Sequence, residues 1–315
     1  MSSSSPPRVG IIGAGAMGTL FGYHLASRCT VTMMDRNTAV LDAIAHSGLS
    51  INDGESQAVA TSRSSSALYN SSVLFLFVKA VDTLQALRPF AGELNPSTPV
   101  VSLQNGVGNE DAIKTALGGA VPVVLGITTE SAFSLSAGHV RNSKSGATIL
   151  GSGGASPETS RWVAELLSTS GLQTSVVYDI RPHLWGKLVA NAAINAVSAL
   201  LDCEVGAIPA NSDAARLSQA IAREAAQVAA ALHINLPFSD PWSYITEIIA
   251  IGAADKSSMA LDLESGHRSE IDHINGAVLA AGRRVGIPTP YNEAVARLIK
   301  AKETLRHAAF ATSAG

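Results

Sequence analysis

Residues 8–26 read RVGIIGAGAMGTLFGYHLA, and their pattern predicts the fold class of the N-terminal half of the chain. A short apolar strand leads into three spaced glycines, and residues with helical spacing follow them. Such a turn suits a dinucleotide, because backbone N–H groups at the start of the helix can approach the pyrophosphate. The acidic residue that this motif requires about 20 positions later is Asp35. The predicted nucleotide-binding turn comprises Gly13, Ala14, Gly15, Ala16, Met17 and Gly18.

Further apolar runs predict that the first strand belongs to a doubly wound sheet. The runs at 31–34, 73–78 and 100–103 are typical of buried parallel strands, and helical segments lie between them. From 122 to 151 the pattern changes to short strands with Gly and Ser turns, which predicts an antiparallel extension of the sheet. We therefore expect an α/β domain over residues 1–179.

Residues 180–315 have almost no strand pattern and predict an all-α domain. We expect helices at 181–201, 212–233, 242–251 and 269–284, with prolines between them. The helix at 212–233 is rich in alanine, and it could pack either in the core of a monomer or against a second subunit. A homodimer is thus one of two expectations.

A polar stripe marks the first of these helices. Residues 181–201 read RPHLWGKLVANAAINAVSALL, in which Lys187, Asn191 and Asn195 recur every four residues among apolar side chains. The three side chains share one face of the helix, because a step of four residues drifts only about 40°. An unpartnered buried ammonium is costly. We therefore expect either a polar group opposite this stripe or a Lys187 side chain that reaches water.

Composition narrows the class of function. The 315 residues are 46% hydrophobic and 15% charged, with a net charge of −3, so neither a nucleic-acid groove nor an anionic membrane surface is indicated. Two cysteines, Cys29 and Cys203, cannot build a disulfide framework, and residues 1–7 predict a flexible tail rather than a signal peptide. A cytoplasmic location is expected. The apolar run at 245–254 is too short to span a membrane, and no metal-binding motif is present.

Five sequence blocks, in order, resemble the ketopantoate reductase (2-dehydropantoate 2-reductase) family. They are GAGAMG at 13–18, VKAVDT at 78–83, QNGVGNE at 104–110, WGKLVANAAINAVSAL at 185–200 and SSMALDLESGHRSEIDHING at 257–276. The resemblance covers nearly the whole chain. It implies a Rossmann-type domain followed by an all-helical domain, NADP as the cofactor and a small 2-keto acid as the substrate.

The resemblance also implies roles for single residues. Lys187 matches the general acid of the family, and Glu270 matches a carboxylate near the reacting centre. The family's substrate-binding positions correspond to Asn191, Asn195 and Ser258. Its cofactor-lining positions correspond to Lys79, Asn105 and Ala132. The chemistry is consistent, because hydride transfer to a ketone leaves an alkoxide that needs a proton donor and a positive charge. We interpret His183 and His273 as surface residues or as indirect supports of the site.

Two features leave the cofactor and the substrate open. Asp35 would hold the ribose hydroxyls of NAD, whereas Arg36 could pair with the 2′-phosphate of NADP. Residues 203–206 read CEVG where some family members have a polar Asn, so recognition of the terminal hydroxyl of ketopantoate would be weaker. The leading hypothesis is NADP(H)-dependent reduction of 2-dehydropantoate to pantoate in pantothenate biosynthesis. The alternatives are an NAD-dependent D-2-hydroxyacid (mandelate-like) dehydrogenase and a non-catalytic nucleotide sensor.

Overall fold

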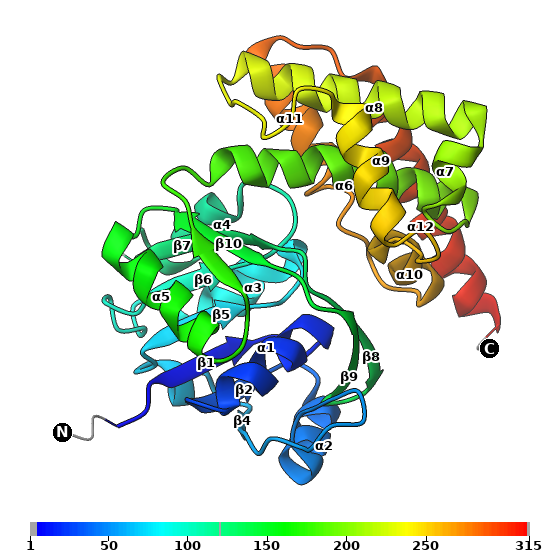
Figure 1. The fold of residues 1–315 in the computed structure, drawn as a ribbon. Helices are drawn as coiled ribbons and strands as arrows, with labels where there is room; N and C mark the ends of the chain where they lie inside the picture. The colour runs from blue at the N-terminus through cyan, green and yellow to red at the C-terminus, as the bar shows by residue number, and fades with distance from the viewer. Residues whose placement is uncertain (1–4, 120, 314–315) are drawn as a thin grey trace. The chain divides into compact units, whose positions relative to one another are not determined.

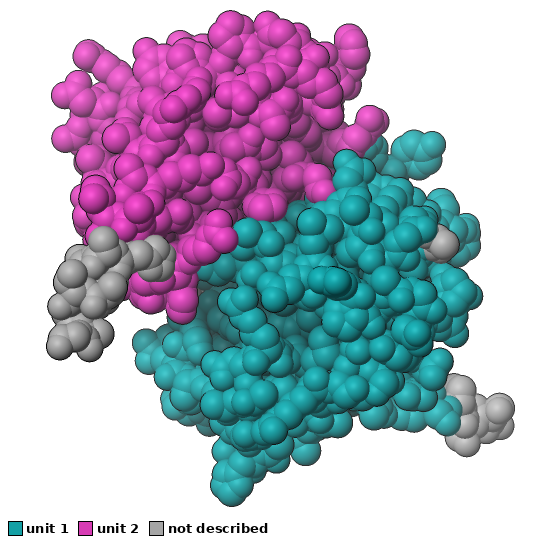
Figure 2. Space-filling view, turned by 180° about the vertical axis from the view of Figure 1, so that it is seen from behind, with its two compact units in different colours: residues 1–104, 109–180 teal, residues 105–108, 181–315 magenta. Residues whose placement is uncertain are grey.

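The computed structural model describes residues 5–119 and 121–313, which form two compact units (Figures 1 and 2). Unit 1 comprises Met1–Gln104 and Asn109–Ile180, and unit 2 comprises Asn105–Gly108 and Arg181–Gly315. The sequence places the division beside residue 179 but gives no sign that 105–108 belong to the second unit. Residues 1–4 of the predicted tail lie outside the described residues.

Unit 1 is built on an eight-stranded sheet with the order β11-β10-β7-β6-β5-β1-β2-β4. Its strands are β1 (Arg8–Ile12), β2 (Thr30–Met34), β4 (Ala60–Ser62), β5 (Val73–Leu76), β6 (Val100–Ser102), β7 (Val123–Thr128), β10 (Thr148–Ser152) and β11 (Thr174–Val176). Neighbouring strands pair in parallel, except that β7 and β10 are antiparallel. The predicted α/β class with a doubly wound sheet is confirmed.

A separate three-stranded sheet has the order β3-β9-β8. Its strands are β3 (Ser50–Ile51), β8 (Ser131–Ser136) and β9 (His139–Lys144). The antiparallel extension expected at 122–151 is therefore only partly right, because β10 extends the main sheet whereas β8 and β9 leave it. The physical reason is burial. Almost all of β7 is buried, as suits a strand covered on both faces, whereas every residue of β8 is half-buried or exposed.

The helices of unit 1 connect these strands (Figure 1). They are α1 (Ala16–Ala26), α2 (Thr38–Ser47), α3 (Thr83–Leu87), α4 (Asn109–Leu117) and α5 (Pro157–Thr169), with short 3₁₀ turns η1 (Ser65–Leu68), η2 (Ala80–Asp82) and η3 (Arg88–Phe90). α5 begins with a capped first turn, since Ser156 accepts a hydrogen bond from the Thr159 N–H and Pro157 follows it. Leu20 and Phe21 of α1 and Phe75 of β5 are fully buried in the core between helix and sheet.

Unit 2 is all-α, as predicted. Its helices are α6 (Arg181–Leu201), α7 (Ala207–Ala210), α8 (Ser212–Ala231), α9 (Pro241–Ile251), α10 (Ser258–Glu264), α11 (Asn275–Val285) and α12 (Pro290–Ser313). α6 packs against α8, α9, α10 and α12. Four of the nine alanines of α8, Ala214, Ala222, Ala225 and Ala229, are buried in this core, so packing within one chain explains these four. The helix expected at 269–284 begins only at Asn275, since residues 271–274 form turns instead.

Among the described residues, α6 is the one helix long and apolar enough to cross a membrane. We did not expect this from the sequence, which drew attention to 245–254 instead. However, 72% of the most apolar window of α6 is buried inside the protein. The helix is the centre of the unit 2 core, and a core helix meets the same criteria of length and composition.

Candidate active site

The turn between β1 and α1 in unit 1 is shaped by its glycines. Gly13 has φ +103°, and a Cβ there would lie 2.7 Å from the backbone of Phe77. A Cβ on Gly18 would collide with the carbonyl oxygen of Gly13, so α1 packs directly against the turn. By contrast, nothing lies within 4 Å of a Cβ placed on Gly15, and no side chain caps the first turn of α1. The turn therefore offers open space beside a helix N-terminus that carries uncapped N–H donors.

Asp35, at the end of β2, is oriented by backbone groups. Its Oδ2 accepts a hydrogen bond from the Ala14 N–H at 2.7 Å, and its Oδ1 accepts one from the Asn37 N–H at 2.8 Å. The next residue, Arg36, is exposed, and its Nη1 lies 3.4 Å from Oδ1 of Asp82. An exposed pair of this kind contributes little energy, so the guanidinium can readily change partners.

The remaining expected cofactor residues lie elsewhere in unit 1. Lys79 precedes η2 at the end of β5, and its carbonyl accepts the Asp82 N–H at 2.8 Å. Ala132 lies on β8 in the small sheet, which packs against α1. Buried Gln104, which we did not single out, donates to Val78 O at 2.8 Å and joins the ends of β5 and β6. Thus the glycine turn, Lys79 and Gln104 follow the adjacent strands β1, β5 and β6 at one edge of the sheet.

Lys187 in unit 2 has an unusual environment. It lies half-buried on α6, and the two residues after it, Leu188 and Val189, are buried in the core. Burial lowers the pKa of Lys187 from an ordinary value of 10.5 to about 8, and the charge of Glu270 acts in the opposite direction. The ammonium is therefore mostly protonated at neutral pH, yet it gives up its proton far more readily than a surface lysine.

Glu270 is held beside Lys187 by the segment 105–108. Asn105 Nδ2 donates to Glu270 Oε2 at 3.0 Å, although the two residues are 165 positions apart in the chain. We expected Asn105 to line the cofactor, and the structure places it against Glu270 within unit 2. Gly106 has φ +86°, and a Cβ there would collide with the carbonyl oxygen of His273. The glycine is therefore what allows the segment to lie directly on the turn after Glu270.

His273 takes part in this turn. Its N–H donates to Glu270 O at 2.9 Å, which helps to fix the backbone of the carboxylate-bearing residue. Its Nδ1 is buried and has no hydrogen-bond partner among the residues that the structure describes. His273 is therefore a support of the site rather than a surface residue.

The side-chain amides of Asn191 and Asn195 in the polar stripe have no hydrogen-bond partner among the described residues. Asn195 is only 7% exposed and Asn191 is half-buried, and neither side chain hydrogen-bonds to any residue in the described ranges. The backbone carbonyl of Asn195 accepts from Ser257 Oγ at 3.2 Å. Neither amide is among the fully buried side-chain groups that lack a partner in the described residues, so both remain accessible. These two amides thus have donors and acceptors to offer a ligand.

Two neighbouring serines divide their roles at the start of α10. Ser257 is buried, and its Oγ caps the helix by accepting from the Ala260 N–H at 3.1 Å. Ser258, the residue expected from the sequence, is exposed as the first residue of α10. Ser198 of α6 completes this junction, because its Oγ donates to Cys203 O at 2.7 Å and accepts the Ser257 N–H at 3.4 Å.

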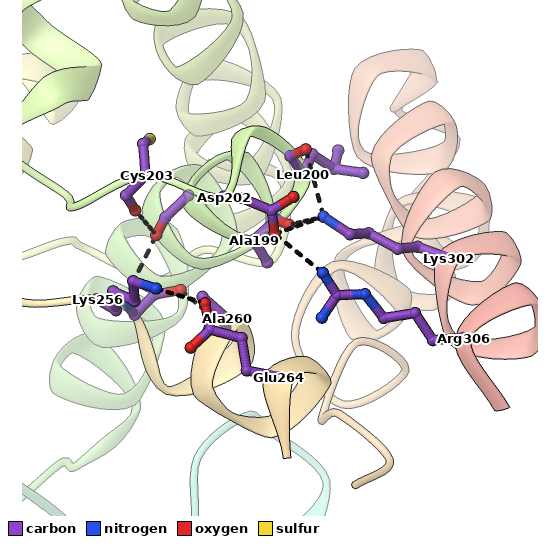
Figure 3. Close-up of polar contacts among 11 residues, drawn as sticks. Ala199, Leu200, Asp202, Cys203, Lys256, Ala260, Glu264, Lys302 and Arg306 are labelled. Carbon is purple, nitrogen blue, oxygen red and sulfur yellow. Dashed lines mark hydrogen bonds and ion pairs between the residues drawn. The ribbon is translucent and has the colours of Figure 1, made fainter. Parts of the chain in front are cut away.

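The C-terminal end of α6 is anchored by α12. Lys302 Nζ donates to Ala199 O at 2.6 Å and to Asp202 Oδ1 at 2.8 Å, and Arg306 reaches the same carboxylate (Figure 3). An ammonium at this position also complements the negative end of the helix dipole. The helix that carries the polar stripe is therefore held at its far end. In the part of the chain that the structure describes, no group of His, Cys, Asp or Glu could hold a metal.

Comparisons with known protein families identify both halves of the chain. Residues 9–154 match the family described as ketopantoate reductase PanE/ApbA, and residues 179–303 match its C-terminal domain. A 2-dehydropantoate 2-reductase of Streptococcus pyogenes serotype M3 is 31% identical over 303 residues, covering 94% of this chain and 97% of the relative. The Archaeoglobus fulgidus 2-dehydropantoate 2-reductase is 32% identical over 302 residues, covering 94% and 98%.

Two solved structures of similar fold cover nearly the whole chain. The PanE/ApbA family ketopantoate reductase of Ralstonia eutropha JMP134 superposes with a TM-score of 0.88 at 29% identity, over 95% of this chain and 99% of that one. D-mandelate dehydrogenase in a ternary structure with NADH and anilino(oxo)acetate gives a TM-score of 0.85 at 28% identity, again over 95% and 99%. The similarity thus extends to proteins named for two different substrates.

Proposed function

Because this chain belongs to the ketopantoate reductase family of oxidoreductases, we propose that it catalyses the NADP(H)-dependent reduction of 2-dehydropantoate to pantoate, a step of pantothenate biosynthesis. The observation that carries the proposal is Lys187, whose pKa of about 8 reflects its burial and the charge of Glu270. Lys187 lies on the same helix as two asparagines whose amides bond no described residue. A non-catalytic nucleotide sensor does not need a lysine whose pKa is lowered toward neutral pH.

The glycine turn of unit 1 suits a dinucleotide. Its open space at Gly15 and the uncapped start of α1 offer room and N–H donors for a pyrophosphate. Lys79 and Ala132 would line the same nucleotide. When bound, the reduced nicotinamide supplies a hydride for the ketone carbon.

The charges near Asp35 favour NADP(H) over NAD(H) in our proposal. Each oxygen of the Asp35 carboxylate already accepts a backbone N–H, which reduces its capacity to accept ribose hydroxyls. Arg36 is exposed and only weakly tied to Asp82. An exposed guanidinium at the end of β2 suits a 2′-phosphate, which it can bind with two hydrogen bonds.

Lys187 acts as the general acid. Its ammonium donates a proton to the oxygen that becomes negative as the ketone is reduced, and its charge stabilises that oxygen during the transfer. Glu270 keeps the amine protonated at neutral pH because its negative charge raises the pKa of Lys187. Asn105 holds the Glu270 carboxylate in place through its Nδ2 donor. The three residues therefore act as one proton-holding unit.

Asn191, Asn195 and Ser258 bind the substrate. Each amide can donate two hydrogen bonds and accept others, which suits the carboxylate and hydroxyl of a 2-keto acid. The Ser258 hydroxyl is exposed at the start of α10 and can add a further contact. Cys29 and Cys203 are both free thiols, which agrees with a reaction in the reducing cytoplasm.

The test is an absorbance assay of NADPH oxidation with ketopantoate and the purified protein. We expect Lys187→Ala to lower kcat by about 10²-fold or more while leaving nucleotide binding unchanged. Lys256→Ala is the matched control, since Lys256 pairs with Glu264 on α10. Absence of oxidation above background in the wild-type protein would overturn the substrate assignment.

A second candidate is an NAD-dependent dehydrogenase of mandelate-like 2-hydroxy acids. Two observations favour it: the similarity to D-mandelate dehydrogenase, and the sequence CEVG at 203–206, which lacks a polar amide after α6. The same assay with a panel of aryl and branched keto acids and both cofactors separates the two. A clear preference for NADH with an aryl keto acid would replace the first assignment by the second.

A further inference from the structure

A buried asparagine at the start of α11 joins three helices of unit 2. Asn275, the first residue of α11, is fully buried. Its Nδ2 donates to Ala192 O of α6 at 3.1 Å and to Asn292 Oδ1 of α12 at 3.1 Å. Asn275 has no role in the reaction described above. Its bond to the main chain of α6, from 83 positions away in the sequence, determines where the two helices meet.

The orientation of this amide is fixed by Glu224 of α8, which is 7% exposed. The Glu224 carboxylate accepts hydrogen bonds from the backbone N–H groups of Tyr291 and Asn292, both at 2.9 Å. The Asn292 Nδ2 group donates to Glu224 Oε2 at 2.8 Å and to Ile221 O at 3.1 Å. Because a carboxylate and a carbonyl only accept, Asn292 must turn its amide oxygen toward Asn275. Asn275 therefore faces two acceptors and presents its NH₂ group to both.

This position requires two donors on one short side chain. Serine and threonine donate one hydrogen bond and an ionised aspartate donates none, whereas the amide of asparagine donates two. The Oδ1 atom of Asn275 is buried and bonds no residue that the structure describes. An unsatisfied buried acceptor destabilises the folded state, so stability alone does not account for an asparagine here.

The bond between α11 and α6 lies near the candidate site along both segments of the chain. Ala192 directly follows Asn191 and lies five positions after Lys187. Asn275 lies five positions after Glu270. The residue that carries the proposed proton and the residue whose charge acts on it are therefore equally far in sequence from the point where their helices are joined.

A tight turn connects the Glu270 carboxylate to the start of α11. The N–H groups of His273 and Ile274 both donate to Glu270 O, at 2.9 and 3.0 Å. A turn closed by backbone bonds moves together with the helix that follows it. The position of Asn275 against α6 therefore sets the position of Glu270 relative to α6.

A second side-chain bond to α6 lacks this relation to the site. Ser218 of α8 is fully buried, and its Oγ donates to Ala193 O at 2.8 Å. Ala193 is the residue after Ala192, so adjacent carbonyls of α6 accept the two bonds. However, α8 carries none of the catalytic or substrate-binding residues assigned above. Of these two bonds, only that of Asn275 leads to a residue of the site.

We propose that Asn275 is a positioning residue, which fixes the place of the Glu270 carboxylate relative to Lys187 by bonding the main chain of α6. Because it is fully buried, Asn275 touches no substrate and acts through Glu270. The inference rests on the function proposed above, which assigns Lys187 and Glu270 to proton transfer. The bond to α6 and the effect of Glu270 on the lysine do not depend on which keto acid is reduced.

The pKa of Lys187, measured by NMR with ¹³C-labelled lysine, tests the proposal without any substrate. The signal that is lost in Lys187→Met identifies the residue. Asn275→Ala removes both donors, so Glu270 is held less firmly and its charge acts less on Lys187. We expect the pKa of Lys187 to fall by about half a pH unit or more. In the keto-acid assay, kcat should fall by about tenfold or more, with an unchanged KM for NADPH.

Three further variants complete the design. Ser218→Ala is the matched control, because it removes an equally buried donor to the next carbonyl of α6, and it should leave the pKa of Lys187 and kcat unchanged. In a Glu270→Gln background, Asn275→Ala should cause no further fall in the pKa, since the charge through which it acts is gone. Asn275→Ser keeps one donor and should give an intermediate pKa. Circular dichroism identifies the variants that fold, and Asn275→Ser serves if Asn275→Ala does not.

Three outcomes would overturn the positioning role. They are an unchanged pKa of Lys187 in a folded Asn275 variant, an equal fall in Ser218→Ala, and a further fall in the double variant with Glu270→Gln. The second would indicate a general loosening of α6, and the third a route other than Glu270. A wild type that fails to reduce ketopantoate, with the expected pKa shift in Asn275→Ala, would support the positioning role and remove only the substrate assignment.

Discussion

The pH dependence of the reaction should follow the protonation of Lys187. Burial lowers its pKa to about 8, against the opposing effect of Glu270. Only the ammonium can act as the acid, so kcat/KM for keto-acid reduction should be level near pH 7 and fall about tenfold per pH unit above about 8. At pH 9 roughly one-tenth of the molecules keep the proton, whereas an ordinary lysine stays protonated to about pH 10. Oxidation of the hydroxy acid should show the opposite trend, because it needs the neutral amine.

The assay is the initial rate of NADPH oxidation between about pH 6 and 10, in the range where the two forms of Lys187 exchange. Glu270→Gln removes the charge that raises the pKa of Lys187 but keeps an oxygen for Asn105. The break, meaning the pH above which kcat/KM begins to fall, should therefore move down by about one pH unit or more. Glu264→Gln, which alters a carboxylate paired with Lys256 on α10, should leave the break in place. A level rate up to about pH 10, or an unchanged break in Glu270→Gln, would refute the reasoning.

Three further results are expected. Lys187→Met should raise the free energy of unfolding at neutral pH by up to about 3 kcal/mol in denaturant titrations, because the folded state no longer holds a lysine with a lowered pKa; an unchanged value would contradict that shift. Arg36→Ala should raise the KM for NADPH by about tenfold and leave that for NADH nearly unchanged; equal effects would argue against a phosphate contact. Gly15→Val should weaken nucleotide binding in calorimetry without lowering Tm, whereas Gly18→Val should lower Tm, since only Gly18 packs against Gly13; similar Tm losses would contradict the open space at Gly15.

Local patterns predict the parts of the fold that depend on local chemistry. The glycines before α1, the Ser156–Pro157 start of α5 and the continuous apolar strands are all visible in the sequence. The sequence does not show that β8 and β9 form a second sheet with β3, because strand pairing depends on contacts between residues far apart in the chain. α12 also escaped notice. It has apolar residues on two faces, which weakens the single-faced periodicity by which a surface helix is found.

In the candidate site, too, local spacing is predictable from the sequence, whereas contacts between distant residues are not. The four-residue spacing of Lys187, Asn191 and Asn195 predicts one face of one helix, and α6 is that helix. The bond between Asn105 and Glu270 joins residues 165 positions apart, so no pattern within a window of sequence could reveal it. The difference between buried Ser257 and exposed Ser258 likewise depends on where α10 begins.

The loop at 105–108 means that the two units cannot be exchanged between relatives by a single crossover. A chimera that takes residues 181–315 from one parent and the rest from another would combine the Glu270 turn of the first with the Asn105–Gly108 loop of the second. Mismatched parents would leave Glu270 without its amide donor and press a foreign loop against His273. Hybrids that carry the four-residue loop along with its own helical half should inherit that parent's substrate range, and hybrids that separate the two should be poorer catalysts than either parent.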